Sequence, residues 1–363
     1  MILRRIEPYH YESIVNCKKR WLGRTVPEVI TTEFRSQTTE QHRQAIQDQR
    51  AYLIRNRGTK AGEISIRGEE ALNNTRIKQG DILYYRVHWH EPPVIDPKNL
   101  EVVDETGDLI AINKPAGIPV HPGGPYRHNC LTELLEKQFG HKVYASHRLD
   151  RLTSGLLIVG RNSKAASTFS EQLRDRAVQK EYLAKVLGRF PERTTQCDYP
   201  LFDLDSSMHR GDQAFRTAVH NQKHSMTQFR VLHYDYNTNE TLVLCVPHTG
   251  RMHQIRKHLA MLGHPITNDQ LYRRRAFHDL AMEVFQNKLS PRAFELYSTL
   301  VSETTAERDS RRLSAPSCNE CGSTLYTDPL PEELGLYLHA FKYRALDGSW
   351  HFETPYPEWA NKS

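Results

Sequence analysis

The sequence predicts an α+β protein in two parts, because three patterns agree. After residue 95, short apolar stretches of strand length dominate, and they do not alternate strictly with helical periods. Strict alternation is typical of a doubly wound parallel sheet, so its absence favours a mixed α+β architecture. A smaller α/β region lies before residue 95, and the prolines between His90 and Pro97 form a stiff linker after it. We therefore expect two domains, at 1–95 and 96–363.

The first region combines helical and strand-like patterns. Residues 12–57 are predicted to be mainly helical, with Thr25 as the start of a helix. Between residues 62 and 89, alternating apolar positions broken by glycine and asparagine predict short strands around Ile64 and from Ile82 onward. This region is therefore expected to form a small α/β unit of its own.

The second region contains the clearest strand patterns, at residues 109–113, 155–160, 181–187, 226–234 and 241–246. Helical periods occur at residues 131–139, 163–176 and 252–262. A charged stretch from Arg273 to Arg312 has few strand signals and predicts a helical or mobile insertion, placed at about 272–320. A strand-like pattern returns at residues 335–343. The insertion thus interrupts a domain made mainly of strands.

Composition places the chain among ordinary globular proteins. Lys and Arg number 49 against 43 Asp and Glu, a net charge of +6, with 19 His in addition. This excess fits either a basic face that binds a polyanion or a solvated mixed surface. The apolar runs stop far short of the roughly 18 residues that a membrane span needs, and the first residues lack a signal-peptide stretch. We expect no membrane association and a cytoplasmic location, with nuclear and mitochondrial compartments left open.

One run carries the strongest chemical signal, His147-Arg148-Leu149-Asp150-Arg151-Leu152-Thr153-Ser154-Gly155. Its single carboxylate, Asp150, lies between two arginines on a turn that leads into an apolar strand. Nearby positive charge favours the ionised form, which can act as a nucleophile or as an electrostatic stabiliser. From the residues alone, a surface Asp–Arg pair that caps a turn fits the run as well.

This run resembles the signature of the RluA-type pseudouridine synthases, and further motifs occur in the family's order. They are Asn113–Gly117 with Val120–Pro122, Lys180–Ala184, His248–Leu259 with Gly263–Ile266, and Leu338–Ala340. The resemblance implies that Asp150 is the catalytic residue and that Tyr182 is the active-site tyrosine. It also implies that Arg256 forms a salt bridge with the catalytic carboxylate and that Leu338 is an apolar wall. The implied fold is a largely antiparallel central sheet flanked by helices, with RNA across a basic cleft.

The reaction that the resemblance implies needs no cofactor. The bond from uridine N1 to ribose C1′ is broken, the uracil turns, and C5 is joined to the same carbon. Asp150 attacks C1′ or acts on the base, and the sequence leaves both routes open. The uridine must first leave its stack, and Arg148 is expected to fill the gap. Tyr182 is expected to stack on the uracil and to take the C5 proton.

Further substrate contacts are expected next to these motifs, from His147, Arg148, Arg151, Thr153, Arg251, His253 and Leu338. Ile255, Leu259 and Leu262 recur at helical spacing, so Arg256 lies beside a core-facing stripe. His253 is three residues from Arg256 and shares its helix face. It is therefore either a wall of the site or a structural histidine.

Four segments of the first 95 residues carry a second resemblance: Trp21–Val29, Glu33–Arg35, Lys78–Ile82 and His90–Val94. They are similar to the front end of eukaryotic enzymes that modify uridine 32 of tRNA, a part related to ribosomal-protein-like RNA-binding modules. The similarity departs at Ser65–Glu69, where such modules have a Val-Asn-Gly turn. Basic side chains here contact phosphates or are solvated surface, namely Lys18, Lys19, Arg20, Arg24 and Arg35. The resemblance implies RNA, and tRNA first, as the partner. We also expect a monomer with no obligatory protein partner, although the sequence leaves the oligomeric state open.

The six cysteines do not suggest a disulfide framework, because they are scattered along a long chain. Cys318 and Cys321 form the one closely spaced pair, and by resemblance this spacing marks the eukaryotic subgroup. Zinc needs four ligands, and no further ligands lie nearby in the sequence. We therefore expect reduced thiols and no metal.

Two other classes of function fit parts of the sequence. An RNA-binding or tRNA-folding protein can retain the synthase fold, but it does not need Asp150, Tyr182 and Arg256 together. A nucleoside-hydrolase-like glycosidase needs a second carboxylate near either motif to activate water, and none occurs there. The zinc-deaminase signature, His-x-Glu with Pro-Cys-x-x-Cys, is absent. The sequence therefore favours an RNA pseudouridine synthase, with tRNA position 32 as the expected target.

Overall fold

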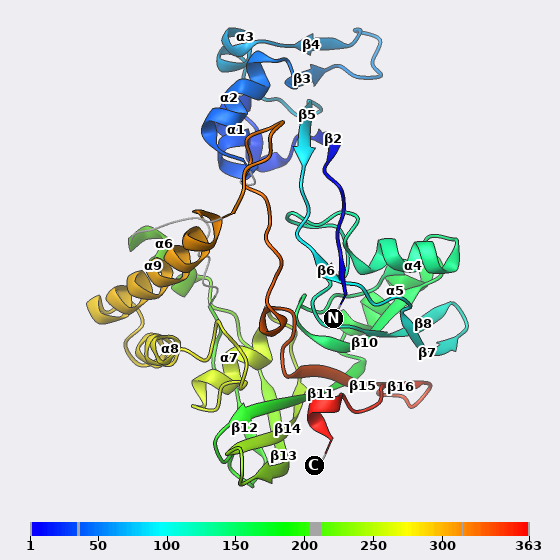
Figure 1. The fold of residues 1–363 in the computed structure, drawn as a ribbon, viewed down its shortest axis with the longest axis vertical. Coiled ribbons are helices and arrows are strands. Elements are labelled where there is room, and N and C mark those ends of the chain that lie inside the picture. Colours follow the sequence, from blue (N-terminus) through cyan, green and yellow to red (C-terminus); the bar gives the residue numbers. More distant parts are fainter. Residues whose placement is uncertain (1, 35–36, 203–211, 314, 362–363) are drawn as a thin grey trace. The chain divides into compact units, whose positions relative to one another are not determined.

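The chain divides into two units, which Figure 1 traces along the sequence. The computed structural model describes residues 2–34, 37–202, 212–313 and 315–361. The larger unit comprises residues 1–4, 93–314 and 328–363, and the smaller unit comprises Arg5–Pro92 and Ala315–Thr327. The segment expected as an insertion, at about 272–320, is therefore divided between the two units, because Ala315–Thr327 belongs to the smaller one. Hydrogen bonds between residues far apart in sequence, described below, hold that segment there.

A mixed sheet lies at the centre of the larger unit (Figure 1). Its described strands are β7 (Glu101–Thr106), β8 (Leu109–Lys114), β9 (Tyr144–Ala145), β10 (Ser154–Gly160), β11 (Val178–Leu187), β12 (Thr195–Cys197), β13 (Thr227–Asp235), β14 (Glu240–Pro247), β15 (Leu338–Ala345) and β16 (His351–Glu353). They follow the order β12-β13-β14-β11-β15-β10-β8-β7, with β16 beside β15 and β9 beside β10. β10 and β15 are parallel, and the other neighbours in this order are antiparallel. The expected α+β class with a largely antiparallel sheet is confirmed.

Gly155 allows β10 to approach β15 closely. It pairs with Ala340 and has a φ of +101°, a conformation that side chains rarely adopt. A Cβ at this position would overlap the carbonyl oxygen of Ala340 and would lie 2.7 Å from its backbone nitrogen. Glycine is therefore required here, and it brings the turn at 147–153 next to the start of β15 at Leu338.

Helices cover this sheet and form a second core beside it. They are α4 (Leu131–Phe139), α5 (Ser163–Arg174), α6 (Asp212–His220), α7 (Gln254–Met261), α8 (Arg275–Asn287) and α9 (Pro291–Leu313). α5 contacts β10, whereas α7 contacts β13 and β14. α8 and α9 pack together around buried Phe277, Leu280 and Tyr297. The helical alternative for the charged stretch at 273–312 is thus confirmed. Two short strands, β1 (Leu3–Arg4) and β6 (Val94–Ile95), form a separate antiparallel pair.

The smaller unit has its own sheet and its own core. Strands β2 (Tyr9–Asn16), β5 (Ile82–Trp89), β3 (Ala51–Arg55) and β4 (Ile64–Ile66) lie in that order, and helices α1 (Val26–Glu33), α2 (Thr39–Gln47) and α3 (Glu69–Asn74) accompany them. Trp21, Val29, Ile46 and Leu83 are buried in its core. A hydrophobic core separate from that of the larger unit makes the smaller unit a domain-like body.

The expected helix start at Thr25 is confirmed, since its side chain caps α1 and Glu28 completes a capping box. The expectation of a mainly helical segment at 12–57 is wrong at both ends, where β2 and β3 lie. In β2, alternate residues are more and less exposed, which is the period of a strand rather than of a helix. Pairing with β5 along the whole length of β2 stabilises the strand. Among the residues that the structure describes, no helix is long and apolar enough to cross a bilayer.

Candidate active site

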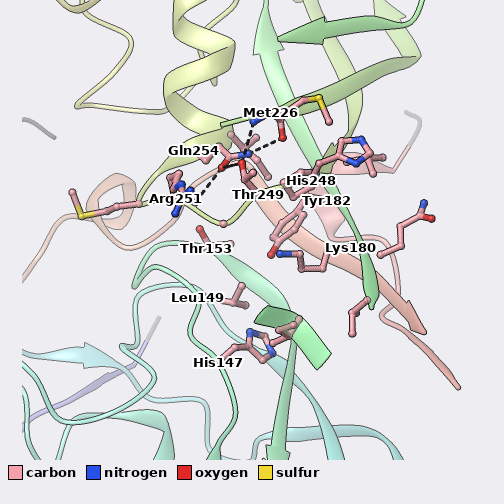
Figure 2. A pocket seen from close by; sticks show the side chains of 18 of the residues that line it. His147, Leu149, Thr153, Lys180, Tyr182, Met226, His248, Thr249, Arg251 and Gln254 are labelled. Atoms are coloured by element: carbon pink, nitrogen blue, oxygen red, sulfur yellow. Dashed lines mark hydrogen bonds between the residues drawn. The ribbon is translucent and has the colours of Figure 1, made fainter. Parts of the chain in front are cut away.

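A cavity of about 1020 Å³ in the larger unit collects the residues expected to act in chemistry. Figure 2 shows several of them, with Tyr182 and Lys180 facing the segment that carries His147, Leu149 and Thr153. The expected residues that line the cavity are His147, Arg148, Asp150, Thr153, Tyr182, Arg251, His253, Arg256 and Leu338. The tenth, Arg151, is not among the lining residues. The sheet and α7 therefore bring most of the expected set together.

Backbone contacts, not its own side chain, hold the turn that carries Asp150. The carbonyl of Asp150 accepts a hydrogen bond from Thr153 N at 3.1 Å. The carbonyl of Arg151 accepts from Gly117 N at 2.8 Å and from Lys114 Nζ at 3.2 Å. The Asp150 side chain remains 31% exposed. Its carboxylate is consequently fixed in place and still accessible to a substrate.

Lys114 is a fully buried support for this turn, and sequence reasoning did not select it. Its Nζ also donates to the carbonyls of Pro115 and Ile118, both at 2.8 Å, so three acceptors match the three N–H donors of an ammonium group. Burial lowers the pKa of Lys114 to about 7. The signal was present, because Lys114 lies within the Asn113–Gly117 motif, but a lysine in a motif suggests ligand contact rather than support.

His253 faces Asp150 from the start of α7. Its Nε2 lies 3.6 Å from Asp150 Oδ2, and its Nδ1 lies 2.8 Å from the Tyr272 hydroxyl. Burial lowers the pKa of His253 to about 4, so the ring is neutral at pH 7. A carboxylate only accepts, which assigns the proton to Nε2 and lets Nδ1 accept from Tyr272. Because 3.6 Å exceeds a normal hydrogen bond, both Asp150 oxygens stay available.

Arg256 does not form the expected salt bridge with Asp150. Its Nε and Nη2 donate to the two oxygens of Asp269, at 2.7 and 2.8 Å. Asp269 is fully buried and also accepts from the backbone N–H groups of Leu271 and Tyr272, both at 3.0 Å. A bidentate pair with a buried carboxylate is the strongest partner that a guanidinium can have. Arg256 therefore anchors the loop after α7, and it lines the cavity as a positioning group.

Tyr182 and Tyr343 share a hydrogen bond on adjacent strands of the sheet. Their hydroxyl oxygens are 2.8 Å apart, on β11 and β15. Burial, with a smaller contribution from the charge of Asp150, raises the pKa of Tyr182 to about 12, although the hydrogen bond with Tyr343 acts in the opposite direction. The phenol is therefore neutral at pH 7, suited to stacking and to donating a hydrogen bond.

A network around Gln254 shapes the loop opposite the Asp150 turn (Figure 2). Gln254 Oε1 accepts from the Thr249 hydroxyl at 2.7 Å and from Arg251 N at 3.0 Å. Its Nε2 donates to the carbonyl of Met226 at 3.0 Å. The guanidinium of Arg251 donates to the carbonyl of His224 at 3.1 Å. The buried amide thus fixes the course of the loop, although only its place in the His248–Leu259 motif hinted at this.

His147 is held by the backbone. Its Nε2 accepts a hydrogen bond from Ile158 N at 3.1 Å, and burial lowers its pKa to about 3. A ring that is neutral and already bonded orients the start of the turn. Thr153 is the opposite case, since its buried hydroxyl has no hydrogen-bond partner among the described residues. A polar atom left in this way beside a cavity is suited to a ligand.

Charge in the cavity is arranged around one acidic group. Among the described lining residues, Asp150 carries the single carboxylate, while the basic side chains are Arg148, Arg174, Arg176, Lys180, Arg251 and Arg256. Lys180 was missed as a site residue, although it lies two positions before Tyr182 in a strand and hence on the same face. Burial lowers its pKa. Such a lining attracts a polyanion and leaves no second carboxylate to activate water.

Comparison with known proteins agrees with this arrangement. The family model described as RNA pseudouridylate synthase matches residues 108–261. The mitochondrial tRNA pseudouridine(32) synthase of Saccharomyces cerevisiae is 36% identical over 379 residues, covering 99% of this chain and 77% of that protein. The tRNA pseudouridine(31) synthase of the same yeast is 32% identical over 401 residues, covering 99% of this chain and 95% of that protein.

A solved human structure, RNA Pseudouridylate Synthase Domain Containing 1, is 24% identical with a TM-score of 0.47, covering 73% of this chain and 86% of that one. The ordered motifs, the mixed sheet and the two yeast relatives lead to one assignment. The chain belongs to the RluA-type RNA pseudouridylate synthases, and it is a pseudouridine synthase, an isomerase that acts on RNA.

Proposed function

We propose that this synthase isomerises a uridine in the anticodon stem-loop of tRNA, with position 32 as the first candidate and Asp150 as the catalytic carboxylate. The observation that carries the proposal is the single accessible carboxylate in an otherwise basic cavity, with Tyr182 in the same lining. The two yeast relatives are named for tRNA positions 31 and 32, which supports a target in that part of tRNA.

A single carboxylate suits an isomerisation better than a hydrolysis. Asp150 attacks ribose C1′ or acts on the base, and on either route the detached uracil has to be rejoined through C5. Hydrolysis needs a second group that activates water. The described lining offers no second carboxylate to activate water, which favours rejoining over hydrolysis.

Tyr182 contributes chiefly through its ring and its neutral hydroxyl. A raised pKa makes a phenolate scarce at pH 7, so the ring first serves to stack on the uracil. Because the phenol is neutral, Tyr182 can take the C5 proton only by giving up its own, and the step balances when that proton goes to N1 of the uracil, while the Tyr343 oxygen at 2.8 Å positions the hydroxyl. The Thr153 hydroxyl is available to a polar atom of the flipped uridine.

The basic residues divide into two groups. In the cavity, exposed Arg148 and Arg251 are available to RNA, and Arg148 is the candidate to fill the gap left by the flipped base. In the smaller unit, Arg20 is bound to Glu33 and Arg24 to the Thr32 hydroxyl. Of the basic side chains expected to contact phosphates in this unit, Lys18 and Lys19 therefore remain the better candidates, and Arg35 lies outside the described residues.

The test is pseudouridine mapping by carbodiimide-dependent primer-extension stops on tRNA incubated with the purified protein. Wild type is compared with Asp150→Ala and with Asp104→Ala, which removes an exposed carboxylate on β7. We expect a new stop at one or a few anticodon-loop uridines with wild type and with Asp104→Ala, and no stop with Asp150→Ala.

Two results would overturn the proposal. If Asp150→Ala marks the same uridine at the wild-type rate, Asp150 is not the catalytic carboxylate. If wild type binds tRNA as tightly as the variant does, yet marks no uridine in tRNA, the tRNA target fails. The same preparation applied to rRNA and mRNA then separates another RNA target from a protein that only binds or folds tRNA.

A further inference from the structure

Four potential metal ligands converge in the smaller unit, and none of them lines the cavity described above. They are His88, His90, Cys318 and Cys321, and one ligand atom from each lies within 4.8 Å of all the others. His88 is the second-last residue of β5, and His90 directly follows the strand. The two histidines are two positions apart in extended chain, so both rings project from the same face. The cysteines come from a segment about 230 positions downstream. Because of this distance in sequence, the cluster cannot be recognised from the residues that neighbour either pair.

The cysteine segment forms a tight turn that presents both sulfurs together. Cys318 N donates to the carbonyl of Ser323 at 2.8 Å, and Gly322 N donates to the carbonyl of Cys318 at 2.9 Å. Gly322 has a φ of +69°, which favours glycine at this point. Ser317 and Thr324 close the turn with an antiparallel bridge. A Cys-x-x-Cys turn of this kind is a common half of a four-ligand zinc site.

The distances fit one tetrahedral ion. With metal distances of about 2.3 Å for sulfur and about 2.0 Å for nitrogen, a tetrahedral zinc site has sulfur–nitrogen edges of about 3.5 Å. The sulfur of Cys318 lies 3.6 Å from His88 Nδ1, and the sulfur of Cys321 lies 3.3 Å from His90 Nε2. Each cysteine sulfur thus lies at this distance from one histidine nitrogen. This pairing fits one shared ion better than a two-iron cluster that keeps its cysteines on one iron and its histidines on the other.

Neighbouring groups orient these ligands. His88 turns Nδ1 to the cluster, and its Nε2 lies 3.4 Å from the carboxylate of Glu320. A carboxylate behind a metal-binding histidine fixes the ring and raises its basicity. The Gln41 amide donates to the carbonyl of Cys321 at 3.2 Å and to the Ser323 hydroxyl at 2.9 Å, which holds the turn against α2. The arrangement therefore has the outer support that metal sites usually show.

We propose that His88, His90, Cys318 and Cys321 bind one zinc ion in a structural site. Two sulfurs and two imidazoles in a tetrahedral arrangement are the donor set that zinc prefers. Four protein ligands leave no position for a substrate, so the ion is structural rather than catalytic. Its effect is to join the segment Ala315–Thr327 to β5 of the smaller unit. The expectation of no metal considered only sequence neighbours, and the fold supplies the two ligands that were missing.

The test is the metal content of the full-length protein, purified without chelators and measured by inductively coupled plasma mass spectrometry. We expect about one zinc per chain, falling to less than about a tenth in the double variant Cys318→Ser/Cys321→Ser. Cys17→Ser, which changes a half-buried cysteine of the same unit outside the cluster, should keep the full content. Cobalt added to the apoprotein should give the visible bands of a tetrahedral site with thiolate ligands.

A second measurement does not depend on any variant folding. In the wild-type protein, Cys318 and Cys321 should resist alkylation until a strong chelator is added, as judged by peptide mass spectrometry. Zinc content that is unchanged in the double variant would overturn the proposal. So would a wild-type protein that contains no zinc after expression with added zinc, a Cys318–Cys321 disulfide in place of metal, or iron with acid-labile sulfide. None of these outcomes affects the test on tRNA.

Discussion

Two turns of the larger unit each carry an aspartate next to α7, and they are built in opposite ways. Asp269 is fully buried, and its two oxygens accept from Arg256 and from two backbone amides. Asp150 is 31% exposed, and its side chain lies 3.6 Å from His253 Nε2, beyond hydrogen-bond distance. The turn at Asp269 is held by its carboxylate. The turn at Asp150 is held by Lys114, Gly117 and the strand that follows.

The difference shows where reactivity can reside. A carboxylate that satisfies its own loop cannot leave those partners without destabilising the protein, whereas a carboxylate held by the backbone of others keeps its lone pairs for a substrate. α7 serves both, because His253 and Arg256 are three residues apart and point to different aspartates. On the proposed role of Asp150, activity and stability depend on different acidic side chains, and this separation can be tested.

The largest expected effect comes from exchanging each aspartate for asparagine. Asp150→Asn should lower the rate of pseudouridine formation by about 10³-fold or more while leaving the melting temperature near the wild-type value, because no support is lost. Asp269→Asn should destabilise the protein by about 3 kcal/mol or more, because it leaves the buried Arg256 charge without its partner. Denaturant unfolding measures the stability of each variant, and single-turnover kinetics at a temperature where both variants are folded measure the rate of pseudouridine formation. A strongly destabilised Asp150→Asn would break the comparison.

A smaller loss of stability is expected at the glycine that positions the Asp150 turn. Gly155→Ala should cost about 3 kcal/mol or more, because it combines a positive φ with overlap against the backbone of Ala340. Gly107→Ala is the matched control, since its φ is +58° but nothing lies within 4 Å of the added carbon. It should cost only about 1 kcal/mol. Equal losses for the two variants, measured by denaturant titration, would show that the close approach of β10 to β15 is unimportant.

Acid sensitivity should come in part from histidines that are buried and neutral in the folded protein. Burial lowers the pKa of His258 and of His339 from 6.5 to about 4. The unfolded chain therefore binds more protons between these values, so stability is complete above pH 6.5 and falls as the pH drops toward 4. The slope is about 1.4 kcal/mol per pH unit for each histidine.

Thermal unfolding at a series of pH values measures this slope. His339→Gln should flatten it, because the variant has no imidazole to protonate. His351→Gln, at an exposed position, should not change it. A slope that is identical in all three proteins would assign the acid sensitivity to other groups.

The smallest expected effect is at His253, which acts through Asp150. His253→Gln should lower kcat by about three- to tenfold with little change in KM, because a neutral side chain at 3.6 Å orients the carboxylate without binding it tightly. The pH profile of kcat between 6 and 8 should keep its shape in the variant, since the pKa of His253 is lowered by burial to about 4. A profile that changes shape in this range would mean that the histidine itself titrates during the reaction.

Sequence reasoning found the parts of the site that are written as ordered motifs. Asp150, Tyr182 and Thr153 lie in such motifs, and the structure places all three in one cavity. It could not find the partner of Arg256, because Asp269 lies 13 residues further on in a loop with no periodic pattern. A contact between a helix and a loop that folds back on it cannot be predicted from a local sequence pattern.

The same limit explains the errors in the fold. The strand at Tyr9–Asn16 alternates in exposure, but its identity depends on a full-length pairing with β5, which lies about 70 residues later. The histidines and cysteines of the smaller unit are a stronger case, since their spacing becomes informative only when the segment Ala315–Thr327 is placed beside β5. The helix start at Thr25 was easier to predict, because its capping contacts with Glu28 lie within one helical turn.

The position of β15 in the sheet affects how the enzyme folds during its synthesis. One half of the main sheet ends at β11 and the other at β10, and β15 lies between them although it is made after α9. During synthesis, Asp150 and Tyr182 therefore emerge long before the strand that joins their two halves. Each half can collapse early, but the cavity cannot close until β15 has left the ribosome. Catalytic competence therefore has to wait for Leu338–Ala345, which are made well after Asp150 and Tyr182.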